Sequence, residues 1–137
     1  MAAAATVDEY IGGFPPEVAD RLQRIRQIIV AAVVRASAGT GSGTNTANPL
    51  PEEKIRYGIA AVMLGGRYAL HFAGWKKHIG LYPVPTLDQP LESEIALYRA
   101  EKDSVVFPHS KPIPYDLIAE VADAVVARSA AAQSEND

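Results

Sequence analysis

Residues 54–83, "KIRYGIAAVMLGGRYALHFAGWKKHIGLYP", decide the fold of this chain. Two alternating apolar runs flank Gly65-Gly66, and paired glycines between such runs favour a tight hairpin turn. A second turn over residues 74–77 leads into a third run at residues 78–83. The stretch therefore predicts an antiparallel sheet made of consecutive hairpins.

The turn at Gly65-Gly66 also predicts which side chains share a face. If Leu64 lies opposite Arg67, counting outward puts the large apolar side chains on one face, which we expect to be the core side of the sheet. These side chains are Tyr57, Ile59, Ala61, Met63, Tyr68, Leu70, Phe72, Ile79 and Leu81.

The opposite face combines small residues with polar aromatic side chains. Placing residues 74–77 in the second turn pairs His71 with Gly80. His71 and His78 then become diagonal neighbours on adjacent strands, with backbone positions about 7–8 Å apart. Tyr82 belongs to the same face. Two imidazoles at this separation can converge on one ion, or they can simply decorate a solvated or packed sheet face.

Helical patterns surround the sheet. One apolar helix stripe, recognised by its three- and four-residue steps, consists of Val18, Leu22, Ile25, Ile29 and Val33. A short helix at residues 6–11 precedes it, and two helices follow the sheet, the second starting at Tyr115. Residues 105–108 are a further strand candidate. We expect a single α+β two-layer domain over residues 1–137, with an antiparallel sheet of three to four strands and helices on one face.

The composition is typical of one globular domain. Of the 137 residues, 48% are hydrophobic and 21% are charged, and the net charge is -3. That balance gives no basic face for nucleic acid, and no apolar run approaches the ~20 residues of a membrane span. Residues 36–49 are rich in Gly, Ser, Thr and Asn, which predicts a flexible inserted loop. We expect a cytoplasmic protein that binds neither nucleic acid nor membranes.

Motifs of catalytic sites are missing from the sequence. The chain contains no cysteine, which excludes thiolate metal sites and a cysteine nucleophile. The glycine-rich runs "GTGSG" and "GGRY" lack the strand-to-helix context of a phosphate loop, and no serine lies in a nucleophile elbow. We therefore predict that the protein is not an enzyme.

Four ordered motifs resemble the DUF1801 family, also called YdhG-like. They are "VDEYI", "EEKIRYGIAAV", "HFAGWKKHIGLYP" and "FPHSKPIPYDLI". The resemblance covers nearly the whole chain apart from both ends and the loop at residues 36–49. It implies a frataxin-like architecture and a small cytosolic protein that binds Fe(II) weakly. It also implies delivery of that iron to iron–sulfur or haem assembly proteins.

The resemblance further implies that acidic residues of the first helices and first strand gather iron. They are Asp8, Glu9, Glu17, Asp20, Glu52 and Glu53. Carboxylate oxygen and imidazole nitrogen both suit iron. The candidate metal ligands are Glu52, Glu53, His71 and His78. For Glu17 and Asp20 a solvated helix face is the simpler interpretation, because an arginine follows each of them four residues later.

A small anionic ligand on the sheet face is the alternative function. Lys76, Lys77 and Arg56 lie near the second turn, beside aromatic residues. The candidate ligand-binding residues are Tyr57, His71, Trp75, Lys77, His78 and Tyr82. Lysines also mark exposed turns, where they discourage association between sheets. A protein partner or a second copy of the chain is a third occupant of this face, so both a monomer and a homodimer stay open.

Overall fold

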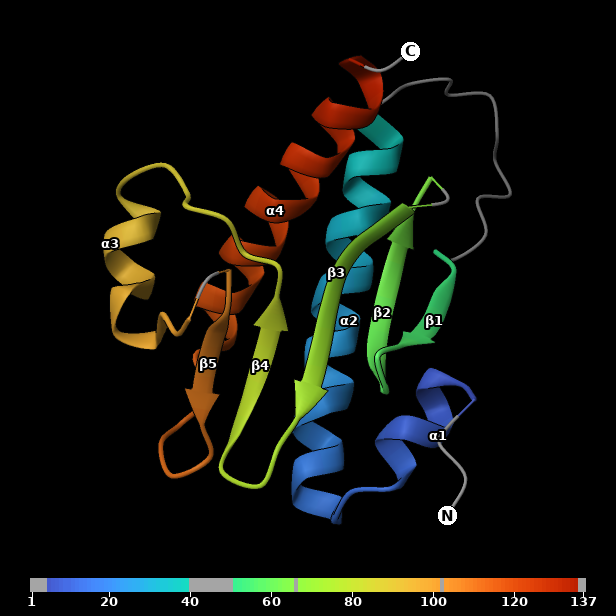
Figure 1. The fold of residues 1–137 in the computed structure, drawn as a ribbon, viewed down its shortest axis with the longest axis vertical. Coiled ribbons are helices and arrows are strands. Elements are labelled where there is room, and N and C mark those ends of the chain that lie inside the picture. Colours follow the sequence, from blue (N-terminus) through green and yellow to red (C-terminus); the bar gives the residue numbers. More distant parts are fainter. Residues whose placement is uncertain (1–4, 40–50, 66, 102, 136–137) are drawn as a thin grey trace.

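The computed structural model describes residues 5–39, 51–65, 67–101 and 103–135. Its elements are α1 (Val7–Gly12), α2 (Pro16–Gly39), β1 (Glu53–Arg56), β2 (Ile59–Leu64), β3 (Arg67–Gly74), β4 (His78–Tyr82), α3 (Leu91–Ile95), the 3-10 turn η1 (Ala96–Tyr98), β5 (Val105–Pro108) and α4 (Tyr115–Glu135). The strands form one antiparallel sheet in the order β1-β2-β3-β4-β5 (Figure 1). The α+β class is confirmed.

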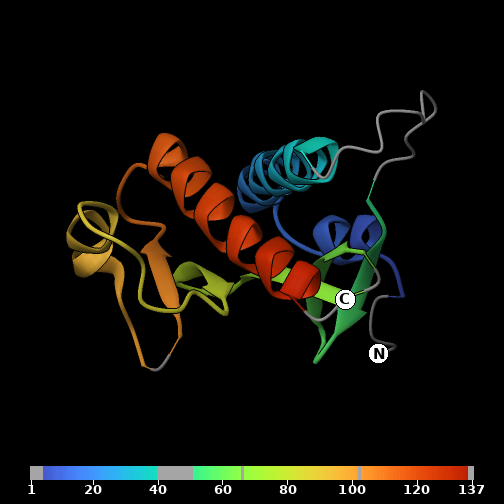
Figure 2. The same cartoon turned by 90° about the horizontal axis from the view of Figure 1, so that it is seen from above.

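Helices α2 and α4 lie side by side on one face of the sheet, as the view from above shows (Figure 2). The predicted stripe of α2 is correct, because Leu22, Ile25 and Ile29 are fully buried. They pack with the inner face of β3 and β4, where Phe72 and Leu81 are also fully buried. Among the described elements, neither long helix covers the other face of the sheet.

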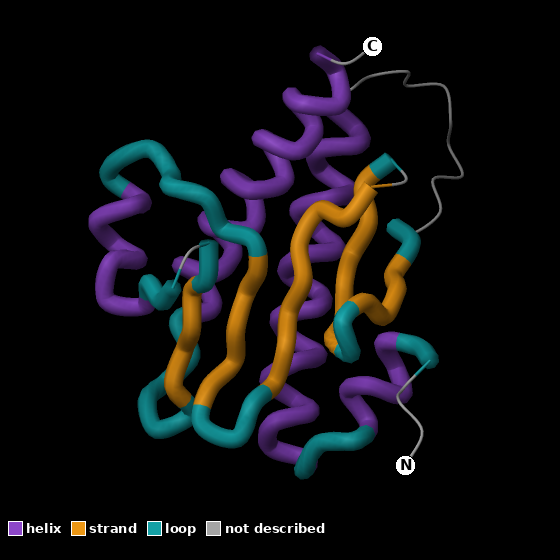
Figure 3. Tube along the Cα trace, in the orientation of Figure 1, coloured by secondary structure: helices purple, strands orange, loops and turns teal. Residues whose placement is uncertain are grey.

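The sheet has five strands, so the expectation of three to four strands is corrected. The extra strand arises because the first apolar run, followed in Figure 3, is a hairpin and not one strand. Tyr57 and Gly58 form its two-residue turn, with φ angles of 58° and 76°. Positive φ at both central residues is the geometry of a type I′ turn, which joins twisted antiparallel strands.

A β-bulge overturns the predicted faces of the first long hairpin. Leu64 does pair with Arg67, as expected, but the register shifts between Val62 and Met63. The extra residue on β3 moves every later pair by one position, which exchanges the two faces. Ala61 and Met63 are buried, but they and Ile59, Tyr57 and Tyr68, all expected on the core face, lie outside the main core cluster. Leu70, Phe72, Ile79 and Leu81 do belong to it, as expected.

The second turn is tighter than expected. The Trp75 N–H donates to the carbonyl of His78 over 2.8 Å, so only Lys76 and Lys77 lie between the paired residues. His71 consequently pairs with Tyr82, where Gly80 was expected. His78 lies four residues away from Tyr82 along β4, about 13 Å at the usual rise of a strand, so the two histidines are not neighbours.

The first four residues of the predicted loop at residues 36–49 are helical. Residues 36–39 form the end of α2, and residues 40–49 lie outside the described part of the chain. Across the described ranges, no helix combines the length and the apolar character needed to span a bilayer.

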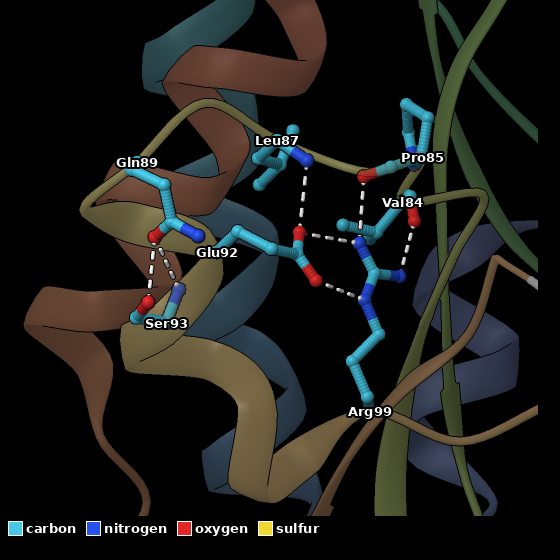
Figure 4. A network of polar contacts seen from close by, with 7 residues as sticks. All are labelled: Val84, Pro85, Leu87, Gln89, Glu92, Ser93 and Arg99. Carbon is cyan, nitrogen blue, oxygen red and sulfur yellow. Dashed lines mark hydrogen bonds and ion pairs between the residues drawn. The ribbon is translucent and has the colours of Figure 1, made fainter.

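A polar network holds the connection between β4 and β5 (Figure 4). Glu92 forms a bidentate ion pair with Arg99, with both N–O distances at 2.9 Å. The same carboxylate accepts from the backbone N–H of Leu87, and Arg99 also donates to the carbonyls of Val84 and Pro85. One guanidinium thus ties α3 and η1 to the end of β4.

Candidate functional site

The uncovered face of the sheet carries a hollow of about 650 Å³. We call it the open-face hollow. Its lining residues are Arg56, Tyr57, Ile59, Tyr68, His71, Trp75, Tyr82 and Pro83. These described lining residues are mostly aromatic and include one cation and no carboxylate. Its volume falls within the range of small-molecule sites, which are mostly apolar with a few placed polar groups.

Three aromatic rings gather around the centre of the hollow. The bulge brings Tyr68 to the face of His71, and their ring centroids lie 5.3 Å apart with planes inclined by 14°. The type I′ turn brings Tyr57 near the same imidazole, with ring centroids 6.2 Å apart and 27° between planes. The two departures from the predicted strand pattern therefore build the walls of the site.

His71 lies at the centre of the site and is only 6% exposed. Its Nδ1 is 3.3 Å from the Tyr82 carbonyl, and a carbonyl can only accept, so Nδ1 carries the proton. Nε2 then keeps its lone pair, and it is buried without a hydrogen-bond partner in the described part of the chain. Burial lowers the pKa of His71, partly offset by the Tyr82 carbonyl, and the nearby Arg56 lowers it further. The ring is therefore a neutral acceptor.

Arg56 closes one end of the site. Its guanidinium carbon lies 4.2 Å from the centroid of the Tyr68 ring and 4.7 Å from that of Tyr57. Stacking of this kind holds the planar group in place while its N–H groups keep their ability to donate. The cation is thus fixed beside the imidazole by aromatic contacts and not by a carboxylate.

Trp75 and Tyr82 form the opposite end. The indole Nε1 donates to the Tyr82 hydroxyl over 2.9 Å, which leaves the hydroxyl proton available for another acceptor. Gly80 makes this arrangement feasible, because a Cβ at that position would lie 1.9 Å from the Tyr82 hydroxyl oxygen. The Tyr82 ring therefore lies directly over Gly80, and glycine is required there.

A histidine outside the hollow anchors the turn that carries Trp75. The Arg21 guanidinium lies 2.9 Å from Nδ1 of His109. Since arginine can only donate, Nδ1 accepts and Nε2 carries the proton, which it donates to the Trp75 carbonyl over 3.0 Å. The His109 backbone N–H also donates to the Lys77 carbonyl. Helix α2 and the start of the β5–α4 connection thus hold the tip of the β3–β4 hairpin.

Four of the six predicted ligand-binding residues line one hollow: Tyr57, His71, Trp75 and Tyr82. The other two do not belong to its lining. Lys77 is exposed in the turn. His78 is the first residue of β4 and pairs with Pro108 of β5. Sequence reasoning missed Ile59, Tyr68 and Pro83 as lining residues and noted Arg56 only as a nearby cation.

The structure does not bring the four predicted metal ligands together. Glu53 reaches the helical face, where it forms a bidentate ion pair with Arg26 at 2.6 and 2.8 Å, whereas His71 lies on the other face. Glu52 lies 3.8 Å from the Lys54 ammonium group. Within the described ranges, no three side chains of the metal-binding types His, Cys, Asp or Glu are grouped as an ion would require.

A second hollow, of about 700 Å³, lies between α2 and the start of β1. Its two described cations are already paired: Arg26 with Glu53 and with Asp8 at 2.7 Å, and Arg35 with Asp123 at 2.7 Å. These ion pairs hold the pKa of Arg26 above its ordinary value. Because its charge is satisfied, this hollow has less to offer a ligand than the open-face hollow.

Comparison with known proteins supports the fold. Neither a family model nor a curated protein matches the chain. A solved structure of a DUF1801-family protein, YdhG of Bacillus subtilis, is similar, with a TM-score of 0.58 and 16% sequence identity over 86% of each chain. At 16% identity this similarity concerns the fold alone. The chain has a fold similar to that of this DUF1801-family structure.

Proposed function

We propose that this protein binds a small organic anion in the open-face hollow and is not an enzyme. The observation that carries the proposal is a cation held on aromatic rings in one mostly aromatic hollow. Among the described residues of the lining, Arg56 is the only charged side chain.

An anionic ligand stabilises this cation. A guanidinium held on aromatic faces forms charge-assisted hydrogen bonds to a carboxylate or phosphate, and these are stronger than neutral ones. The described lining residues include no carboxylate that would repel an anion.

The test uses Trp75, which is the only tryptophan of the chain. We would titrate the protein with small carboxylates and phosphates, including benzoate, citrate and glycerol phosphate, and follow Trp75 emission. We expect saturable binding of at least one compound, weakened about tenfold or more by Arg56→Met. Arg128→Met removes an equal charge from an exposed position of α4 and should leave affinity unchanged. A flat response to the whole panel would refute the proposal.

Iron delivery remains a prediction of the resemblance. An anaerobic calorimetric titration with Fe(II) tests it directly, beside a Glu52→Ala/Glu53→Ala variant. Saturable heat that disappears in the double variant would support an iron site at the start of β1. Binding that instead requires His71 would place iron in the hollow and contradict the organic-anion proposal.

A further inference from the structure

The tip of the β3–β4 hairpin carries Trp75, which lines the open-face hollow and is held at three points. Its backbone N–H donates to the His78 carbonyl, its indole donates to the Tyr82 hydroxyl, and its carbonyl accepts from Nε2 of His109 over 3.0 Å. The first two contacts lie within the hairpin itself. Of the three, only the contact with His109 ties Trp75 to another part of the fold.

This contact is one link of a chain that ends on helix α2. Arg21 donates to Nδ1 of the His109 ring over 2.9 Å, and the His109 backbone N–H donates to the Lys77 carbonyl over 2.9 Å. Because a guanidinium has no acceptor, Nδ1 must keep its lone pair in this arrangement. The chain from Arg21 through His109 to Trp75 therefore requires a neutral imidazole with its proton on Nε2.

A second proton on His109 is incompatible with this chain. Protonated imidazole carries an N–H group on both nitrogens, so Nδ1 would direct a hydrogen at the Arg21 guanidinium and two cations would lie side by side. Glu17 lies 3.9 Å from Arg21 and offers the guanidinium another partner. Whether the guanidinium or the imidazole moves, the link between α2 and the hairpin tip is broken.

The surroundings of His109 offer no anion to compensate for the added charge. Among the described residues, none of the ion pairs involves His109. The charged or titratable side chains on the elements next to it are Glu17, Asp20 and Arg21 of α2, Lys76, Lys77 and His78 of the hairpin, and Lys111 of the β5–α4 connection.

We infer that His109 is a positioning residue of the open-face hollow and that its protonation releases the hairpin tip, so that the hollow holds its anion less tightly in acid than at neutral pH. The inference rests on the proposed function, because it concerns the regulation of the same site. Histidine is the side chain whose charge ordinarily changes near neutral pH. A released tip lowers affinity because Trp75 must then be ordered again when the ligand binds.

The first measurement follows Trp75 emission and its quenching by acrylamide without any ligand, from about pH 8 to about pH 5.5. His109→Gln keeps an amide N–H that can donate towards Trp75 but takes up no proton in this range. We expect a pH-dependent change in the wild type that is absent in His109→Gln. His71 and His78 are present in both proteins, so their titration cancels in the comparison. A flat wild-type response, or the same change in His109→Gln, overturns the inference.

Two arginine variants test the link to α2. Arg21→Met removes the cation that faces Nδ1 and should reduce the pH-dependent change of Trp75. Arg24→Met removes an equal charge from the same helix, where the guanidinium lies 4.3 Å from the centroid of the Tyr115 ring, and should leave the change intact. Thermal unfolding of each variant at neutral pH shows whether it is folded. Equal responses of the two variants would overturn the role of Arg21.

The second measurement is the affinity for benzoate, by calorimetry at the two ends of the same pH range. Benzoate stays largely ionised throughout, so its own charge does not change the result. We expect wild-type affinity to fall about fivefold in acid, the size of one typical hydrogen-bond contribution, and His109→Gln to bind equally at both pH values. If citrate or glycerol phosphate is the compound that binds, the ratio of wild type to His109→Gln at each pH removes the ligand's own protonation.

The regulation and the proposed function fail in different ways. If an anion binds in an Arg56-dependent manner and its affinity changes with pH equally in wild type and His109→Gln, the regulation is refuted and the proposed function stands. If no anion of the panel binds at any pH, the proposed function is refuted together with the regulation of binding, and Trp75 emission still decides whether His109 controls the hairpin tip.

Discussion

Replacing Glu92 by Gln should destabilise the protein by an amount that depends on pH. The hydrogen bonds from Arg99, followed by the one from the Leu87 N–H, lower the pKa of Glu92 from its ordinary 4.5 to about 2. A change of that size corresponds to at most about 3 kcal/mol of stabilisation. Since the Glu92 side chain is 20% exposed, solvent screening reduces the expected loss to about 2 kcal/mol at pH 7.

The sign of the pH dependence follows from the lowered pKa. The carboxylate contributes its full stabilisation above the unfolded value of 4.5, and the contribution is lost as pH falls towards about 2. Urea unfolding followed by far-UV circular dichroism, at pH values between neutral and strongly acid, measures the difference between wild type and Glu92→Gln. Glu94→Gln is the matched control, because Glu94 is an exposed neighbour on the same helix. An equal loss in both variants, or one that does not narrow at acid pH, would refute the ion-pair argument.

Three further outcomes are expected. Gly80→Ala should displace the Tyr82 ring, whose hydroxyl oxygen would lie 1.9 Å from the new Cβ. The substitution should lower the free energy of unfolding in urea by about 1–3 kcal/mol. It should also change the emission of Trp75, which donates to the Tyr82 hydroxyl. Unchanged emission would contradict the contact between Gly80 and the Tyr82 ring. Burial lowers the pKa of His71 below its ordinary 6.5. As pH falls below 6.5, the imidazole is therefore protonated more readily in the unfolded chain, and the free energy of unfolding should decrease. His71→Phe should flatten this part of the stability–pH curve. Tyr57→Asn should stabilise the fold by about 0.5–1 kcal/mol in the same assay, because asparagine tolerates the positive φ of 58°. It should also weaken binding of the organic anion, since Tyr57 lines the hollow. Equal or lower stability would argue against strain in the turn.

The helical layer could be predicted from the sequence because its signal is long and regular. The stripe from Leu22 to Val33 repeats at helical spacing over several turns, so a single irregular residue cannot change the result. The strand at residues 105–108 was likewise recognisable from its apolar run and corresponds to β5. These elements depend on periodicity, which is a property of sequence alone.

The register of the sheet could not be predicted, because it depends on three local irregularities. The bulge at Val62 and Met63 has no glycine or other residue that marks it. The turn at Tyr57-Gly58 places a bulky residue where asparagine or glycine is usual, and the tight turn at Lys76-Lys77 lacks both. With a period of two, each one-residue error in register exchanges the two faces.

The candidate site was predicted in part for the same reason. His71 and Tyr82 were assigned correctly to one face, because shortening the second turn from four residues to two shifts the register by two positions, which preserves the alternation. Tyr68 was assigned to the core, and the structure places it against His71. The pairing of His71 with His78 failed because diagonal contacts require the register itself.

The order of the strands has a consequence for how the chain folds. Every strand pairs with its neighbour in sequence, so the sheet grows by successive closure of local hairpins, and only the β4–β5 pair encloses a longer connection. The contact between α2 and α4 joins the two ends of the chain, which makes it the contact of greatest sequence separation. Loop closure is entropically most expensive for such contacts. The sheet can therefore assemble strand by strand, and the docking of α4 onto α2 completes the cooperative unit.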